Sequence, residues 1–135
     1  MDLDRALRIS AAGMQAQSTR LRVVAENLAN SDSTGNAPGA DPYRRKTVTF
    51  ANTMDRSIGA NTLRANRIGT DSDAFPQRYD PSHPAADANG YVKTPNVDPA
   101  IEAMDMREAQ GTYSANLAVL ETTRGMLTRT IQALG

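Results

Sequence analysis

The sequence predicts a mainly α fold with a small β-rich insertion, in which paired long N- and C-terminal coiled-coil helices flank a Pro-rich, strand-containing middle. Three observations support this prediction. All seven prolines fall between residues 38 and 99, and proline disrupts helix interiors. Apolar residues recur every seven positions at both ends, and the middle contains alternating runs typical of strands. We therefore expect an N-terminal coiled-coil helix over residues 1–30, an extended, β-rich middle over 31–98 and a C-terminal coiled-coil helix over 99–135.

In the first segment an apolar residue recurs at every seventh position, at Leu7, Met14, Leu21 and Leu28. A strict seven-residue repeat predicts a helix that supercoils left-handedly against a partner. The stripe is thin, because Ser10, Gln17 and Ser18 interrupt it. We therefore expect this helix to be marginally stable in the free chain and fully stable only in an assembly.

The last segment has a clear helix start. Asp98 is a favoured N-cap residue, and Pro99 suits the first helical position. The same heptad spacing follows at Met106, Tyr113, Leu120, Leu127 and Leu134.

The middle reads as turns and short strands. Residues 43–51 alternate in the manner of a strand, and residues 62–70 are a weaker candidate. Asn89-Gly90 is typical of a type I′ turn.

Composition excludes several classes of protein. The chain has 15 basic and 15 acidic residues and no cysteine, which disfavours nucleic-acid binding and a polybasic membrane anchor and excludes disulfides and thiol chemistry. The chain has no run of about 18 apolar residues, so we expect no direct membrane insertion. The N-terminus lacks the basic and apolar regions of a cleaved secretory signal. Aromatic residues make up only 4% of the chain, so we expect a small core.

The chain offers no convincing catalytic, metal or cofactor site. His83 is the only histidine and lies in a Pro-rich stretch, so we expect a role in a turn or in packing. Asp71-Ser72-Asp73 lacks the glycine and glutamate of an EF-hand calcium loop. Arg44-Arg45-Lys46 would diverge along a strand, and we interpret this run as a solvated, charge-protected edge. We expect no enzyme activity and no cofactor.

The run from Asn27 to Gly35 is rich in Asn, Ser and Asp, which favour helix ends and turns. Leu21–Gly35 (LRVVAENLANSDSTG) also resembles the signature near the N-terminus of bacterial flagellar axial proteins, the rod, hook and hook-associated families, although Glu26 stands where Asn is frequent. Residues 96–135 resemble the matching C-terminal helix of this family. Residues 79–97 look like a segment that marks its proximal rod members.

This resemblance implies a structural subunit of the proximal rod of the flagellar basal body. Such proteins are exported through the flagellar type III apparatus without a cleaved signal peptide. They assemble helically in the periplasm with copies of themselves and other rod proteins, and they transmit torque towards the hook. The family has no catalytic activity and no cofactor.

From the heptads and the resemblance together we predict an assembly interface, with two asparagines that fix the exit of the first helix. The predicted residues are Leu7, Met14, Leu21, Leu28, Asn27, Asn30, Met106, Tyr113, Leu120 and Leu127. Another axial protein, from a different part of the rod or the hook junction, is one alternative. A soluble coiled-coil adaptor or export chaperone is a second. A small hydrolase is disfavoured by its single, badly placed histidine.

Overall fold

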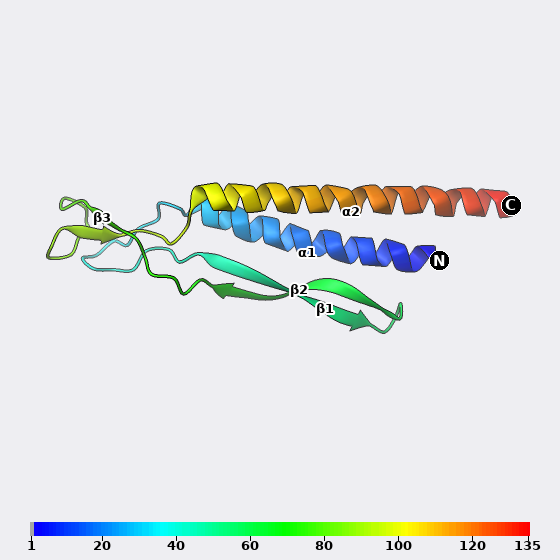
Figure 1. The fold of residues 1–135 in the computed structure, drawn as a ribbon, viewed down its shortest axis with the longest axis horizontal. Helices are drawn as coiled ribbons and strands as arrows, with labels where there is room; N and C mark the ends of the chain where they lie inside the picture. Colours follow the sequence, from blue (N-terminus) through cyan, green and yellow to red (C-terminus); the bar gives the residue numbers. More distant parts are fainter. Residues whose placement is uncertain (1) are drawn as a thin grey trace. The chain divides into compact units, whose positions relative to one another are not determined.

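The structure of the protein is a computed structural model that describes residues 2–135. In this described part of the chain two long helices, one at each end of the sequence, flank a middle region with four strands (Figure 1). The elements are α1 (Leu3–Ala29), β1 (Lys46–Asp55), β2 (Ala60–Thr70), β3 (Gln77–Tyr79), β4 (Tyr91–Lys93) and α2 (Pro99–Leu134). The predicted arrangement of two terminal helices around a strand-containing middle is confirmed.

Side-chain caps explain where the helices begin and end. Asp2 Oδ1 accepts a hydrogen bond from the Asp4 N–H at 3.0 Å, and Asp98 Oδ1 accepts one from the Ala100 N–H at 3.0 Å. These bonds satisfy donors that have no partner inside a helix. Asn30 Nδ2 donates to the Glu26 carbonyl at 2.9 Å, at the end of α1. Asp98 is thus the predicted N-cap of α2, and Asn30 holds the exit of α1.

Strands β1 and β2 form a two-stranded sheet. The Asp55 carbonyl accepts the Gly59 N–H at 2.9 Å, and Gly59 turns the chain with a positive φ of 64°, a conformation that glycine adopts without steric cost. β2 overlaps its predicted range closely. β1 begins three residues later and ends four residues later than predicted, because residues 43–45 are held by contacts from other segments.

The β3–β4 pair is antiparallel, with Gln77 opposite Lys93 and Tyr79 opposite Tyr91. The predicted type I′ turn at Asn89-Gly90 is wrong, since that turn needs positive φ at both central residues and no described residue other than glycine has one. Instead the Gly90 N–H donates to the Asp87 carbonyl at 3.0 Å, and of the two residues Asn89 and Gly90 only Gly90 has a positive φ. The Asp87 carboxylate accepts the Asn89 and Tyr91 N–H groups, which favours this turn.

The chain divides into two compact units. Unit 1 contains the residues up to Leu21, Val48–Arg67 and Arg107–Gly135, and unit 2 contains Arg22–Thr47 and Ile68–Met106. Each unit therefore combines pieces of the N-terminal, middle and C-terminal segments. Neither long helix is apolar enough to cross a membrane, within the part of the chain that is described.

Candidate assembly surfaces and a buried polar cluster

Unit 2 contains two buried polar side chains, Asn27 on α1 and Glu102 on α2, which are 1% and 0% exposed. Asn27 Oδ1 accepts the Tyr43 O–H at 2.7 Å and the Lys46 N–H at 2.9 Å. Asn27 Nδ2 donates to the Lys46 carbonyl at 2.9 Å and to Glu102 Oε2 at 3.3 Å. All four hydrogen-bonding positions of this amide are therefore used.

Arg45 neutralises Glu102. Its Nε donates to Glu102 Oε1, and its Nη1 donates to Asp71 Oδ2 at 3.3 Å. Asp105 Oδ2 lies 3.7 Å from Arg45 Nη2. A buried carboxylate needs such pairing, because an isolated charge is costly away from water. We call Asn27, Tyr43, Arg45, Lys46 and Glu102 the polar cluster.

The electrostatics of the polar cluster follow from its acidic surroundings. Burial raises the pKa of the Tyr43 hydroxyl, and the charges of Glu26 and Glu102 raise it further. The hydrogen bond that Arg45 donates to Glu102 raises the pKa of Arg45, against the opposing effect of its own burial. The neutral phenol and the charged guanidinium are therefore the forms that the folded chain favours.

The expectation of a solvated edge at Arg44-Arg45-Lys46 is wrong. Arg45 belongs to the polar cluster, and Lys46 Nζ lies 2.5 Å from Glu26 Oε1. Arg44 Nη1 donates to the Asp71 carbonyl at 2.7 Å, and its guanidinium carbon lies 4.1 Å from the centre of the Phe75 ring. All three partners come from distant parts of the sequence, which is why local alternation does not reveal them.

His83 has the packing role predicted for it. The Ala85 N–H donates to His83 Nδ1 at 2.9 Å, and His83 Nε2 lies 3.1 Å from Thr34 Oγ1. The ring therefore ties the loop after α1 to the loop after β3. No three His, Asp or Glu side chains between residues 2 and 135 are placed to hold a metal ion.

In unit 1 the two helices approach through small side chains and run antiparallel. A Cβ added to Gly13 would lie 2.9 Å from Asn116 Nδ2, so the helices approach closely here and a larger residue at position 13 would displace the Asn116 amide. Arg20 Nη2 and Glu108 Oε2 form an ion pair at 3.4 Å, one heptad further along α1. Gln17 is 5% exposed, and its Oε1 has no hydrogen-bond partner among residues 2–135. The Gln17 amide therefore differs from the Asn27 amide of unit 2, which uses all its hydrogen-bonding positions.

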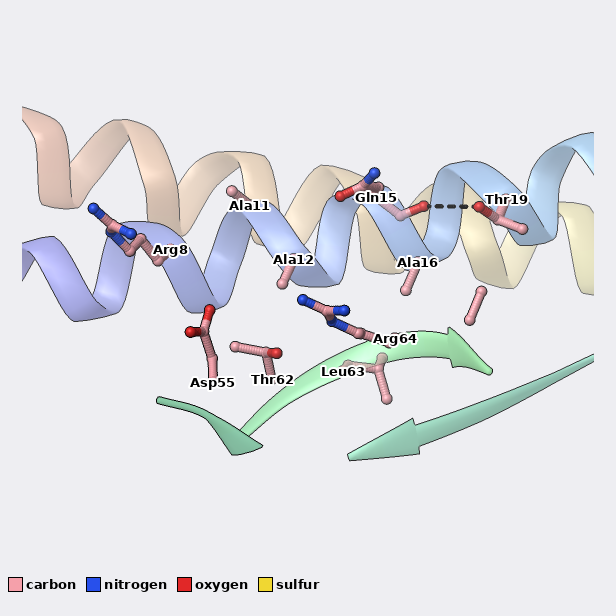
Figure 2. Close-up of a pocket in the computed structure, with 11 residues that line it drawn as sticks. Arg8, Ala11, Ala12, Gln15, Ala16, Thr19, Asp55, Thr62, Leu63 and Arg64 are labelled. Carbon is pink, nitrogen blue, oxygen red and sulfur yellow. Dashed lines mark hydrogen bonds between the residues drawn. The ribbon is translucent and has the colours of Figure 1, made fainter. Parts of the chain in front are cut away.

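A groove separates α1 from the β1–β2 sheet in unit 1 (Figure 2). Its volume is about 510 Å³. Ala12 and Ala16 point from α1 toward β2, where Thr62 and Leu63 line the opposite wall. The short side chains leave this interface incompletely filled.

The structure places the predicted interface residues in two groups. Asn27 is buried inside the chain, and Asn30 is partly buried at the end of α1. The eight heptad residues are only partly buried in the single chain: Leu7, Met14, Leu21, Leu28, Met106, Tyr113, Leu120 and Leu127. Leu134, which continues the repeat, is 84% exposed.

Sequence reasoning missed two features of α2. One is the buried Glu102, which reads as a solvated helix residue. The other is a set of exposed apolar side chains at Ile101, Met104, Val119 and Met126. Their spacings of three, fifteen and seven residues bring them to one side of an α-helix of 3.6 residues per turn. These residues had a detectable signal, a second apolar row on a different side of α2 from the heptad.

Comparisons with known proteins agree in the family they indicate. Residues 7–37 match the family described as "Flagella basal body rod protein", and residues 88–133 match "Flagellar basal body rod FlgEFG protein C-terminal". The chain is 51% identical to the flagellar basal-body rod protein FlgC of Agrobacterium fabrum, with 98% of this chain and 95% of that protein covered. It is 40% identical to FlgC of Salmonella typhimurium, with 91% of both covered. Identity to FlgC of Bacillus subtilis is 34%, over 93% of this chain and 94% of that protein.

Proposed function

The chain belongs to the FlgC family of flagellar basal-body rod proteins and is a structural subunit of the rod, and we propose that it assembles through the apolar rows of α1 and α2. One observation carries this proposal. The eight heptad residues stay partly exposed in the single chain, and α2 exposes a further apolar row. Full burial of an exposed apolar side chain contributes about 1.5–3 kcal/mol, so covering these partly exposed residues contributes a fraction of that for each.

In this proposal α1 and α2 form a coiled-coil pair that packs against equivalent helices of neighbouring subunits. Repeated head-to-tail contacts produce an open helix when the rotation between subunits does not close a ring. The N-terminal, middle and C-terminal segments then have separate tasks: the two helices form the packed tube, and the Pro-rich middle braces adjacent subunits.

The remaining parts of the proposal follow from the family. The subunit lies in the proximal, periplasmic part of the rod, beside copies of itself and other rod proteins, and transmits torque towards the hook. It reaches the periplasm through the flagellar type III export apparatus without a cleaved signal peptide. It has no catalytic activity and no cofactor, and it neither binds nucleic acid nor enters the membrane.

Swimming of a complemented deletion strain tests the assembly interface. We expect Leu120→Asp to abolish motility, because a carboxylate in the packed row loses its hydration. Ser114→Asp is the matched control, since it adds the same charge at an exposed polar position of α2 and should swim normally. Normal swimming of Leu120→Asp would contradict the proposed interface.

The alternative of a soluble adaptor or export chaperone makes a different prediction. Such a protein would form a stable small oligomer with fully formed helices. Light scattering of the purified chain distinguishes the two, because a rod subunit of this kind is expected to be monomeric before assembly.

A further inference from the structure

The two helices meet at equivalent positions in both units. In unit 1 Gly13 faces Asn116, and in unit 2 Asn27 faces Glu102. Asn27 lies fourteen residues after Gly13, and Glu102 lies fourteen residues before Asn116. Fourteen residues are two heptads, so both contacts belong to one antiparallel register.

The contact in unit 1 does little to choose that register. A slip of one heptad would bring Gly13 opposite Ala109 or Thr123 instead of Asn116. Both are small, and both are buried on the same side of α2 as Asn116. Small residues permit close approach of helices at any of these positions, so sterics discriminate weakly among the three registers.

The contact in unit 2 discriminates strongly. The same slips would place Asn27 opposite Pro95 or Ala109, and neither side chain can accept its Nδ2–H. Asn27 is also bound to the main chain of Lys46, and Glu102 is bound to the neighbouring Arg45. One short segment, residues 45–46, therefore anchors both helices.

We propose that the polar cluster fixes the register in which α1 and α2 of one chain pair, before any neighbouring subunit is present. A buried polar residue can set register in a helix pair, because every other register leaves it without partners. The contact between Gly13 and Asn116 in unit 1 then forms in the register that the polar cluster sets. This inference goes beyond the proposed function, since it concerns pairing within a single chain and holds whatever the subunit assembles with.

Cysteine pairs can report the register, because the chain has no cysteine of its own. Gly13→Cys is combined in turn with Asn116→Cys, Ala109→Cys or Thr123→Cys in the full-length protein. The equilibrium yield of each disulfide in a glutathione redox buffer measures how often the two positions meet. Only the 13–116 pair reports the register of the structure, and the other two report slips of one heptad.

We expect the 13–116 disulfide to be favoured over both others by about tenfold or more, the effect of roughly one hydrogen bond in a buried site. The combined variant Asn27→Leu with Glu102→Leu removes the polar contact and keeps apolar volume. It should reduce this preference about fivefold or more. Glu108→Gln, which removes only the exposed ion pair with Arg20, is the matched control and should leave the preference unchanged.

An unchanged preference in the double leucine variant, with its helical circular dichroism retained, would overturn the proposal. So would equal yields of all three disulfides in the otherwise native chain. If the double variant loses its helical signal, Glu102→Gln decides. That change keeps the size of the side chain and removes the charge that pairs with Arg45, so it should lower the preference, and no change there would also overturn the proposal.

Discussion

The two units use the same helices in different ways. In unit 2 the helix contact is polar and fully satisfied, with Asn27 and Glu102 bound to each other and to residues 45–46. In unit 1 the contact consists of small side chains around Gly13, an exposed ion pair and a buried Gln17 oxygen without a partner. Unit 1 also contains the groove between α1 and the β1–β2 sheet. From this difference we expect unit 2 to be stable on its own and unit 1 to become stable only in contact with neighbouring subunits.

This division suits a subunit that must stay separate before it assembles. In this account unit 2 folds first and holds the two helices in one register. Unit 1 buries its apolar side chains only when it contacts a neighbouring subunit. Segments that order on binding behave in this way.

The largest expected effect is in unit 2. Glu102→Ala leaves Arg45 and Asn27 with unsatisfied groups, so we expect it to lower the free energy of unfolding by about 3 kcal/mol. Glu108→Ala removes only the exposed pair of unit 1 and should cost under about 0.5 kcal/mol. Urea unfolding measures both, followed by amide NMR signals of residues 22–47 and 68–106 for Glu102→Ala and of residues 3–21, 48–67 and 107–134 for Glu108→Ala. Similar losses for the two variants would erase the distinction between the units.

A second effect concerns pH. The folded-state pKa of Tyr43 is raised above its ordinary value of 10.0, so the stability that the neutral phenol contributes is complete below that value. It is lost as the pH rises from the unfolded pKa through the folded one. We expect unit 2 to weaken above about pH 10.

Tyr43→Phe should abolish this alkaline step and cost about 1 kcal/mol at neutral pH, because the bond to Asn27 is lost. Tyr113→Phe, in unit 1, should keep the step. Stability curves from pH 7 to 11 of the two variants make the comparison, and an alkaline step that survives Tyr43→Phe would assign it elsewhere.

The smallest expected effect is a stabilisation of unit 1. Gln17→Leu removes the buried oxygen that lacks a partner, so it should stabilise unit 1 by about 1 kcal/mol in the free chain. Increased helical circular dichroism of the monomer is the expected readout. Gln110→Leu, at an exposed position of α2 in the same unit, should produce no such increase.

Local chemistry allowed the helices to be predicted well. α2 begins at the predicted Pro99 because Asp98 caps it, and the prolines confine strands and turns to the middle. The seven-residue period was also informative. The innermost contacts, at Gly13 and Asn27, nevertheless lie one residue before the predicted Met14 and Leu28, because small and polar residues occupy the position of closest approach.

The polar cluster was not predictable in the same way. Its hydrogen bonds join residues that are 16 to 75 positions apart along the chain, so no local pattern links them. Glu102 alone looks like an ordinary acidic residue in the first turn of a helix, and Arg45 looks like part of a solvated basic run. Only the fold brings the two charges together and removes them from water.

Amide hydrogen exchange of the free, full-length chain at micromolar concentration tests the contrast between the units most directly. Exchange reports the free energy of local opening for each segment. We expect strongly protected amides in the parts of α1 and α2 that belong to unit 2, residues 22–29 and 99–106, and clearly weaker protection in residues 3–21 and 107–134. Uniformly slow exchange along both helices in the monomer would contradict the dependence of unit 1 on its neighbours.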